Sequence, residues 1–155
     1  MENNSTYMVA KQKLSHYCSY QERTITEAQK KLQAYKDLNA AEANQIIQEL
    51  IQENFLDQKR YAIAFVRGKF FIKKWGKAKI EHALRNKKIE ANLIQEALNH
   101  ISDEEYTHTL QDLILKKKTT LGVRDKTTTQ KKLINYLLQK GYELELIQDN
   151  LQKIL

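Results

Sequence analysis

Apolar residues recur along this chain at intervals of three and four, the spacing that places them on one face of an α-helix. In the middle of the sequence, one apolar stripe occupies residues 80–84 and the next occupies residues 93–101. A third lies within residues 104–117, and a similar stripe precedes all of these within residues 57–71. A further helix is expected at about residues 5–20. The pattern therefore predicts a succession of amphipathic helices.

The helical pattern also repeats. Residues 79–98 (KIEHALRNKKIEANLIQEAL) align with residues 132–151 (KLINYLLQKGYELELIQDNL) at an offset of 53, and eight of the twenty aligned positions are identical. A weaker third copy lies at residues 26–50. Because a fixed period of this kind is typical of stacked helical units, the chain is predicted to contain three units of about fifty residues.

Capping signals divide each unit into helices. A Ser, Thr or Asn followed three residues later by Glu or Gln is typical of a helix start. The pairs of this kind are Thr26 with Gln29, Asn39 with Glu42, and Ser102 with Glu105. Gly141 is expected to end a helix. These signals predict an N-terminal helix in residues 1–22 joined to the first repeat, followed by repeats at residues 23–71, 72–118 and 119–155.

The composition agrees with a helical chain, because proline is absent and glycine occurs only four times. A helix of four turns cannot bury its apolar stripe alone, so each unit is expected to form a small bundle. Units that meet only along narrow edges give a long array instead of a globule. The predicted fold is all-α, with three tandem three-helix-bundle repeats in an elongated and curved arrangement.

Positive charge is concentrated in two blocks. Residues 59–88 contain eleven Lys or Arg and one acid, a net charge of +10, and residues 116–140 contain eight against one, a net charge of +7. Since the whole chain carries +7, the remainder carries −10. Basic blocks on an otherwise acidic chain indicate a polyanion or a nucleoprotein as partner. The simpler interpretation of any single lysine is that it solvates a helix face.

Candidate partner-binding or nucleic-acid-binding residues are the basic side chains of these blocks. They are Arg67, Lys69, Lys73, Lys74, Lys77, Arg85, Lys88, Lys116, Lys117, Lys118 and Arg124. Phe70, Phe71 and Trp75 lie among them, and aromatic rings beside lysines can stack on unpaired bases. Core packing is the favoured alternative for Trp75, which precedes a helix start. Phe70 and Phe71 are adjacent and cannot both face inward, so one of them is expected to be exposed.

Other kinds of chemistry find no support in the sequence. The histidines lack zinc-ligand spacing and companion cysteines; they are His16, His82, His100 and His108. The acidic triplet at residues 103–105 fits a helix start better than a catalytic pair. There is no phosphate-binding loop, no nucleophile motif, and no apolar run that suits a signal peptide or a membrane span. We therefore expect no catalytic residue, metal or cofactor, no membrane association, and a cytoplasmic location.

Four segments occur in an order and spacing that resemble one known family. They are RTITEAQKKL (23–32), ENFLDQKRYAIAFVRGKF (53–70), WGKAKIEHALRNKKI (75–89) and QKGYELELIQDNL (139–151). Together they resemble the RecX family, small bacterial regulators of the RecA recombinase that are built from three-helix repeats. The resemblance runs from about Tyr17 to Leu155. The sequence departs from the family pattern at Asp57-Gln58, where paired aspartates are usual.

The resemblance implies a monomer that binds the RecA filament on single-stranded DNA and mainly inhibits its assembly, ATP hydrolysis and strand exchange. It also implies contact with single-stranded DNA, within the filament or weakly alone. Two other functions are compatible with the residues. The basic blocks alone would suffice for a helical protein that binds DNA or RNA directly, and the repeats would suit a scaffold for other proteins.

Overall fold

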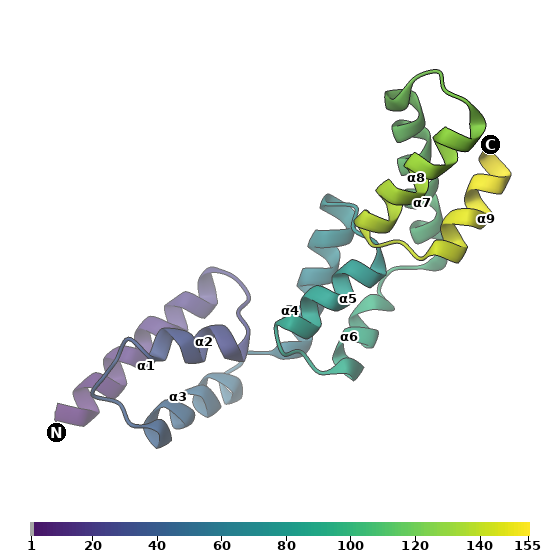
Figure 1. The fold of residues 1–155 in the computed structure, drawn as a ribbon. Coiled ribbons are helices and arrows are strands. Elements are labelled where there is room, and N and C mark those ends of the chain that lie inside the picture. Colours follow the sequence, from purple (N-terminus) through teal and green to yellow (C-terminus); the bar gives the residue numbers. More distant parts are fainter. Residues whose placement is uncertain (1) are drawn as a thin grey trace.

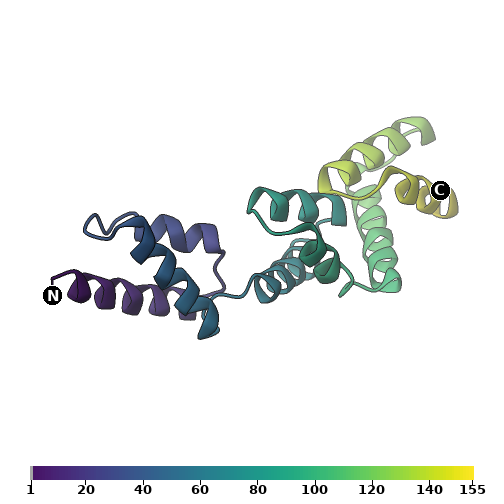
Figure 2. The same ribbon diagram turned by 90° about the horizontal axis from the view of Figure 1, so that it is seen from below.

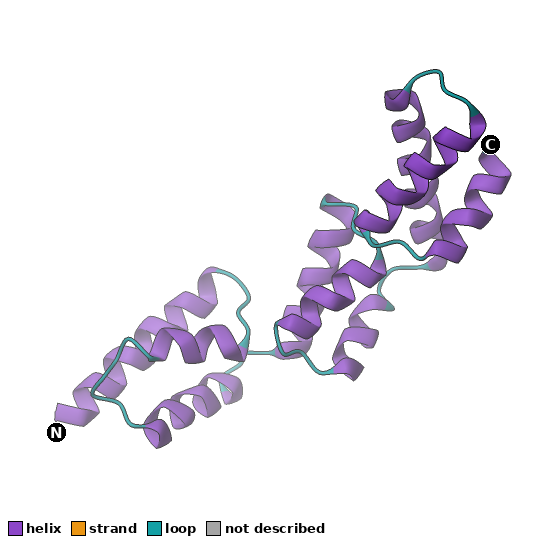
Figure 3. Cartoon of the chain, viewed as in Figure 1, coloured by secondary structure: helices purple, strands orange, loops and turns teal. Residues whose placement is uncertain are grey.

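The chain folds as a row of helical bundles, and the computed structural model describes residues 2–155, with side chains from Ser5 onward. All regular secondary structure in this described part is helical, and the bundles form a long, curved array (Figures 1 and 3). The helices are α1 (Glu2–Tyr20), α2 (Ile25–Leu32), α3 (Ala40–Gln52), α4 (Gln58–Arg67), the π-helical turn η1 (Gly68–Ile72), α5 (Lys77–Asn86), α6 (Ala91–Leu98), α7 (Asp103–Leu121), α8 (Lys126–Lys140) and α9 (Leu144–Ile154). The predicted all-α repeat fold is confirmed; residue 1 of the expected N-terminal helix lies outside the described residues.

Most of the predicted helix ends are found where the sequence placed them. Asn39 and Glu42 form the reciprocal capping box of α3, and the Ser102 hydroxyl accepts the backbone N–H of Glu105 at the start of α7. Gly141 ends α8 with φ +101°, a backbone conformation that glycine adopts freely. The cap predicted at Thr26 is wrong, since α2 begins one residue before it.

The capping box of α2 is formed by Thr24 and Glu27 instead. Thr24 has extended backbone angles, its hydroxyl accepts the N–H of Glu27 at 3.0 Å, and the Glu27 carboxylate accepts the N–H of Thr24 at 3.4 Å. Thr24 is followed three residues later by Glu27, and Thr26 is followed three residues later by Gln29, so both threonines fit the capping-box pattern. Burial decides between them, because Thr24 is buried and Thr26 is exposed.

Packing groups the helices into three bundles, α1–α3, α4–α6 and α7–α9 (Figure 1). The buried residues of residues 10–56 form one core, and those of residues 61–151 form another. This grouping differs in phase from the expected boundaries after residues 22, 71 and 118. The helix at residues 58–67, expected to close the first repeat, packs mainly against α6. A sequence repeat gives the length of the repeating unit. It does not tell which of three consecutive helices comes first in each bundle.

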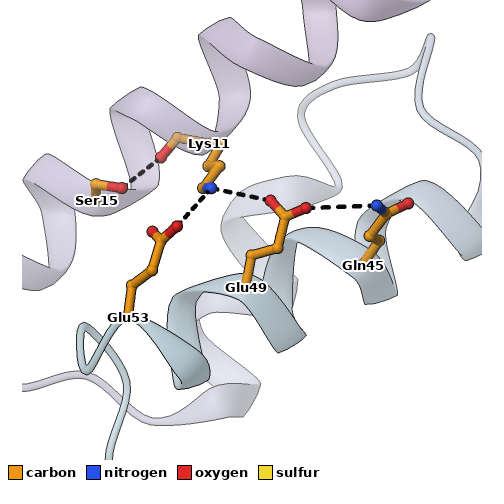
Figure 4. Close-up of polar contacts among 5 residues, drawn as sticks. All are labelled: Lys11, Ser15, Gln45, Glu49 and Glu53. Carbon is orange, nitrogen blue, oxygen red and sulfur yellow. Dashed lines mark hydrogen bonds and ion pairs between the residues drawn. The ribbon is translucent and has the colours of Figure 1, made fainter.

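The first bundle is closed by its own contacts. Ala10, Leu14 and Cys18 of α1 are buried against residues of α2 and α3. On the outside of this bundle, the Lys11 ammonium bridges two carboxylates, that of Glu49 on α3 at 3.0 Å and that of Glu53, the residue just after α3, at 2.9 Å (Figure 4). The first bundle therefore has a core of its own, separate from the core of the second bundle.

The junction between the first and second bundles is polar and narrow. The Arg60 guanidinium pairs with the Glu22 carboxylate and donates to the backbone oxygen of Asn54 at 2.9 Å. The backbone N–H of Ile25 donates to the side-chain oxygen of Gln58 at 3.3 Å. Both ribbon views show a single crossing of the chain between these bundles (Figures 1 and 2). The two cores do not merge at this junction.

The junction between the second and third bundles is built from backbone in close contact. The N–H of Gly76 donates to the oxygen of Lys140 at 2.7 Å, and the N–H of Ala78 donates to the oxygen of Gly141 at 3.0 Å. A Cβ atom on Gly76 would lie 2.3 Å from the backbone carbon of Gly141, so only glycine fits. The core continues without a break from α4 to α9.

Two tyrosines close the same junction from inside. The rings of Tyr106 and Tyr142 stack with centroids 5.1 Å apart. The Tyr106 hydroxyl accepts the N–H of Lys77 at 2.9 Å and donates to the Glu143 carboxylate at 2.7 Å, while the Tyr142 hydroxyl donates to the backbone oxygen of Lys74 at 3.0 Å. Burial is the main cause that raises the pKa of both hydroxyls above the ordinary value.

Replacing Gly76 with Ala should destabilise the protein, because the new methyl group must push the third bundle away from the second. Forced overpacking of this kind costs about 1–3 kcal/mol. The matched control is Gly68→Ala, since nothing lies within 4 Å of a Cβ at Gly68 and its backbone is helical. That control should raise stability by about 0.5–1 kcal/mol. Urea unfolding followed by circular dichroism measures both; equal stability of the two variants would contradict the tight contact at Gly76.

The buried tyrosines predict a loss of stability at high pH. The folded-state pKa of Tyr106 is raised, so between its unfolded value near pH 10 and the higher folded value only the unfolded chain releases the proton. Stability is thus complete below about pH 10 and falls above it by about 1.4 kcal/mol per pH unit for each such group. Tyr106→Phe should flatten that slope in urea unfolding at pH 9–11, whatever it costs at neutral pH. A slope that is equally steep in Tyr106→Phe and in the unmodified chain would contradict this account.

Candidate basic interface

The predicted binding residues differ in how freely their side chains meet solvent. The exposed members of the set are Arg67, Lys73, Lys74, Arg85, Lys88, Lys116, Lys118 and Arg124. Lys69, Lys77 and Lys117 are half-buried, and each holds its ammonium within 5 Å of an aromatic ring centroid. The structure gathers some of these residues into one cluster in the second bundle and leaves others apart.

The cluster is shaped by the π-helical turn η1. Five residues, Gly68–Ile72, follow α4 in this wider helical form, and the chain then leaves it through Lys74 with φ +61°. The turn buries Phe70 and leaves Phe71 45% exposed, which confirms that only one of this pair faces inward. The N–H of Trp75 donates back to the oxygen of Lys69 at 2.9 Å, so the two residues are held together.

The aromatic rings of Trp75 and Phe65 contact three lysines of the cluster. The ammoniums of Lys69 and Lys79 lie 4.7 and 4.4 Å from the centre of the Trp75 ring. The ammoniums of Lys69 and Lys87 lie 5.5 and 5.7 Å from the centre of the Phe65 ring. The two rings meet edge to face at 6.5 Å. Trp75 packs against the core, as expected, but it remains half-buried and so has a solvent-facing part.

Lys140 adds a third-bundle residue to the cluster. Its ammonium donates to the backbone oxygen of Lys73 at 3.0 Å. Burial lowers the pKa of Lys140, and the nearby positive charges of Lys79 and Lys73 lower it further. No ion pair with a carboxylate is found for Lys69, Lys73, Lys79, Lys87 or Lys140 within residues 5–155. These five lysines, with Trp75 and Phe65, are called the junction cluster below.

Sequence reasoning missed three of the five lysines of this cluster, Lys79, Lys87 and Lys140. Lys79 follows Trp75 by only four residues, so its closeness to the ring could have been predicted from the sequence. Lys140 lies 67 residues after Lys73, and only the stacking of the second and third bundles brings the two together. No local pattern could have paired them.

Two of the predicted residues are engaged elsewhere. The Lys77 ammonium lies 4.6 Å from the centre of the Tyr106 ring, in a pocket also lined by Asp103, Glu143 and Asp149. The Arg85 guanidinium pairs with Glu81 at 2.7 Å. Acidic side chains thus surround or neutralise both cations, which are less suited to a polyanion than the junction cluster.

The second basic block is spread along the third bundle. The Lys117 ammonium lies 4.7 Å from the Tyr136 ring centre, and Tyr136 precedes Lys140 by one turn of α8. Arg124 belongs to the loop before α8 and donates to the backbone oxygen of Leu121 at 3.1 Å. Because α8 spans fifteen residues, or about 22 Å, Arg124 lies far from Lys140 at the other end of that helix.

No group of three or more His, Cys, Asp or Glu residues in the described part of the chain is arranged to hold a metal ion. Among the helices described, none combines the length and the hydropathy of a membrane span. The electrostatic feature that stands out is therefore a set of unpaired lysines on aromatic rings.

Comparison with known proteins places these features in a family. The family model described as "RecX, second three-helix domain" matches residues 57–98, which contain α4 to α6. A regulatory protein RecX from Clostridium acetobutylicum is 31% identical over 152 residues, covering 96% of this chain and 70% of that protein. The chain belongs to the RecX family. The resemblance seen in the sequence is thus confirmed.

Further RecX relatives agree in fold and differ in length. A regulatory protein RecX of Bacillus cereus is 28% identical over 138 residues, and the alignment covers 89% of this chain but only 51% of that relative. The chain therefore spans about half the length of this relative. A crystal structure of RecX from Lactobacillus salivarius matches with a TM-score of 0.88 at 25% identity, covering 97% of both chains. A second RecX crystal structure, at 24% identity and a TM-score of 0.84, shows the same fold.

The crowding of lysines at the junction predicts a measurable titration. Removing the charge of Lys73 should raise the pKa of Lys140, because one of its two repelling neighbours is lost while the backbone oxygen that accepts its hydrogen bond remains. Lys73→Gln tests this by NMR titration of the lysine ε-methylene groups, with exposed Lys88→Gln as the control. A Lys140 pKa that stays unchanged or falls in Lys73→Gln would show that the two ammoniums do not interact.

Proposed function

We propose that this chain is a non-catalytic regulator that binds the filament of RecA recombinase on single-stranded DNA. In this role it mainly inhibits filament assembly, ATP hydrolysis and strand exchange. Membership of the RecX family supports a regulatory role in general. The proposal of an anionic partner rests on the junction cluster, because its lysines have no carboxylate partner in the described part of the chain.

The electrostatics of the junction cluster favour a partner of negative charge. Lys73 and Lys79 each repel Lys140, so an anion that binds beside Lys140 offsets an unfavourable interaction. A filament on DNA offers phosphates and acidic protein side chains over a long surface, which suits an elongated array. Binding that depends on exposed lysines weakens as salt rises, since mobile ions screen the charges.

We further propose that the chain acts as a monomer in the cytoplasm and needs no cofactor. Each bundle then presents its surface along the same partner, and affinity accumulates over the length of the array. The predicted residues Arg67, Lys73, Lys74 and Lys88 are exposed beside the junction cluster or on the same bundle, and we retain them as proposed contacts. Lys116, Lys118 and Arg124 are proposed as a separate contact at the far end of the third bundle.

Reversing three exposed charges in and beside the junction cluster should remove the inhibition of RecA. In the variant Arg67→Glu, Lys73→Glu, Lys74→Glu, the concentration needed for half-inhibition of RecA ATP hydrolysis on single-stranded DNA should rise at least about tenfold, because attraction becomes repulsion at the contact. The matched control reverses three exposed lysines of the first bundle, Lys13, Lys30 and Lys36, and leaves the same net charge of +1.

Both variants are first checked by circular dichroism for unchanged helicity. The control should inhibit nearly as well as the unmodified chain if the location of charge matters, and poorly if only net charge does. Inhibition by the first variant at the original concentration would remove the basic contact from the proposal. No inhibition by the unmodified chain itself would reject the regulatory role on RecA.

A further inference from the structure

The proposed function leaves the ring of Trp75 unassigned. Basic contacts to a filament need lysines but no aromatic side chain, whereas here the half-buried ring of Trp75 lies beside two lysine ammoniums. We propose that Trp75 and Phe65 form a stacking shelf for an unpaired base of a nucleic-acid strand, and that Lys69, Lys79 and Lys87 contact the adjacent phosphates. The inference rests on the proposed function, because it gives the same surface a single strand as its direct ligand.

The geometry of the shelf fits a flat ligand that carries negative charge. Trp75 meets Phe65 edge to face at 6.5 Å, which leaves the two ring planes at 73° to each other and presents a corner of aromatic surface. Lysine ammoniums lie over both rings at 4.4–5.7 Å from the centroids. A nucleotide offers a matching combination, since its base has a π-face and its phosphate has the opposite charge to lysine.

The lysines over the rings do not block this binding mode. An exposed cation–π contact is worth about 0.5–1 kcal/mol, whereas stacking of a base on an aromatic side chain is worth about 1–3 kcal/mol. A base can therefore displace an ammonium from the Trp75 ring. The released lysine stays close to the shelf on its flexible stem, where a phosphate of the same strand replaces the lost contact.

The surroundings of the shelf favour a strand over a single small anion. The cluster continues from Trp75 through Lys79 to Lys140 of the third bundle, and one turn of α8 away the half-buried ring of Tyr136 carries Lys117 at 4.7 Å. Rings and ammoniums thus alternate across the junction of two bundles. A chain of nucleotides has the same alternation of bases and phosphates, whereas a polyanion without bases would use the lysines alone.

Trp75 is the only tryptophan of the chain, so its fluorescence reports the shelf directly. The unmodified chain is titrated in low salt, without RecA, with a twenty-residue oligothymidine, a duplex of equal length, and inorganic polyphosphate. Stacking predicts that the single strand quenches Trp75 fluorescence, because a base contacts the indole. The duplex, whose bases are already stacked, and polyphosphate, which has none, should bind with much less quenching. Equal quenching by polyphosphate would overturn the proposal.

Affinity of variants supplies an independent readout by fluorescence anisotropy of a labelled oligothymidine. Trp75→Leu should weaken binding about 5- to 150-fold, the range that corresponds to about 1–3 kcal/mol of stacking. Trp75→Tyr should restore most of it, since the ring returns. Phe71→Leu, which removes another exposed aromatic residue of the same bundle, should bind like the unmodified chain. Unfolding curves show whether Trp75→Leu remains folded, and Lys79→Gln with Lys87→Gln tests the phosphate contacts if it does not.

The outcomes separate the shelf from the regulatory role. Quenching of the unmodified chain by single strands, with weaker binding of the labelled strand by Trp75→Leu, together with unaltered RecA activity, would support the shelf and reject regulation of RecA. Inhibition of RecA with no binding of bare single strands, or with Trp75→Leu binding as well as the unmodified chain, would reject the shelf and leave the regulatory role standing.

Discussion

The contact between the backbones of Gly76 and Gly141 is the constraint on which the rest of the described surface depends. It joins the start of α5 to the end of α8 through two backbone hydrogen bonds and leaves no room for a side chain at Gly76. The same approach brings Lys140 to Lys73 and Tyr142 to Lys74. Without it, the lysines of two bundles would remain separate groups of solvated charges.

Bringing these lysines together costs electrostatic free energy. Lysines usually relieve their mutual repulsion by extending into water, but Lys140 is held at a backbone oxygen close to two others. The neighbouring core of Tyr106, Tyr142 and Phe70 is what holds the bundles together against this repulsion, because it buries large aromatic surfaces in one continuous cluster. Hydrophobic packing thus keeps Lys140 close to two other positive charges.

Sequence reasoning reached the fold because its signals are local. The period of 53, the caps at Asn39 and Ser102, and the glycine at residue 141 all act within a few residues or between similar segments. The phase of the repeat was not accessible, since α4 has an apolar face that would suit either neighbouring bundle, and tertiary packing makes the choice. The candidate site followed the same rule: Lys69 and Lys73 lie near Trp75 in the chain and were found, whereas Lys140 joins them only through the fold.

The polar junction between the first two bundles has a consequence for how the molecule moves. Since each side has its own closed core and Arg60 with Glu22 and Gln58 supplies the bridging contacts, rotation there exposes little apolar surface. The second and third bundles cannot rotate in this way without opening their shared core. Displacing the first bundle would thus break a few polar contacts, whereas displacing the third bundle would have to open a core that it shares with the second.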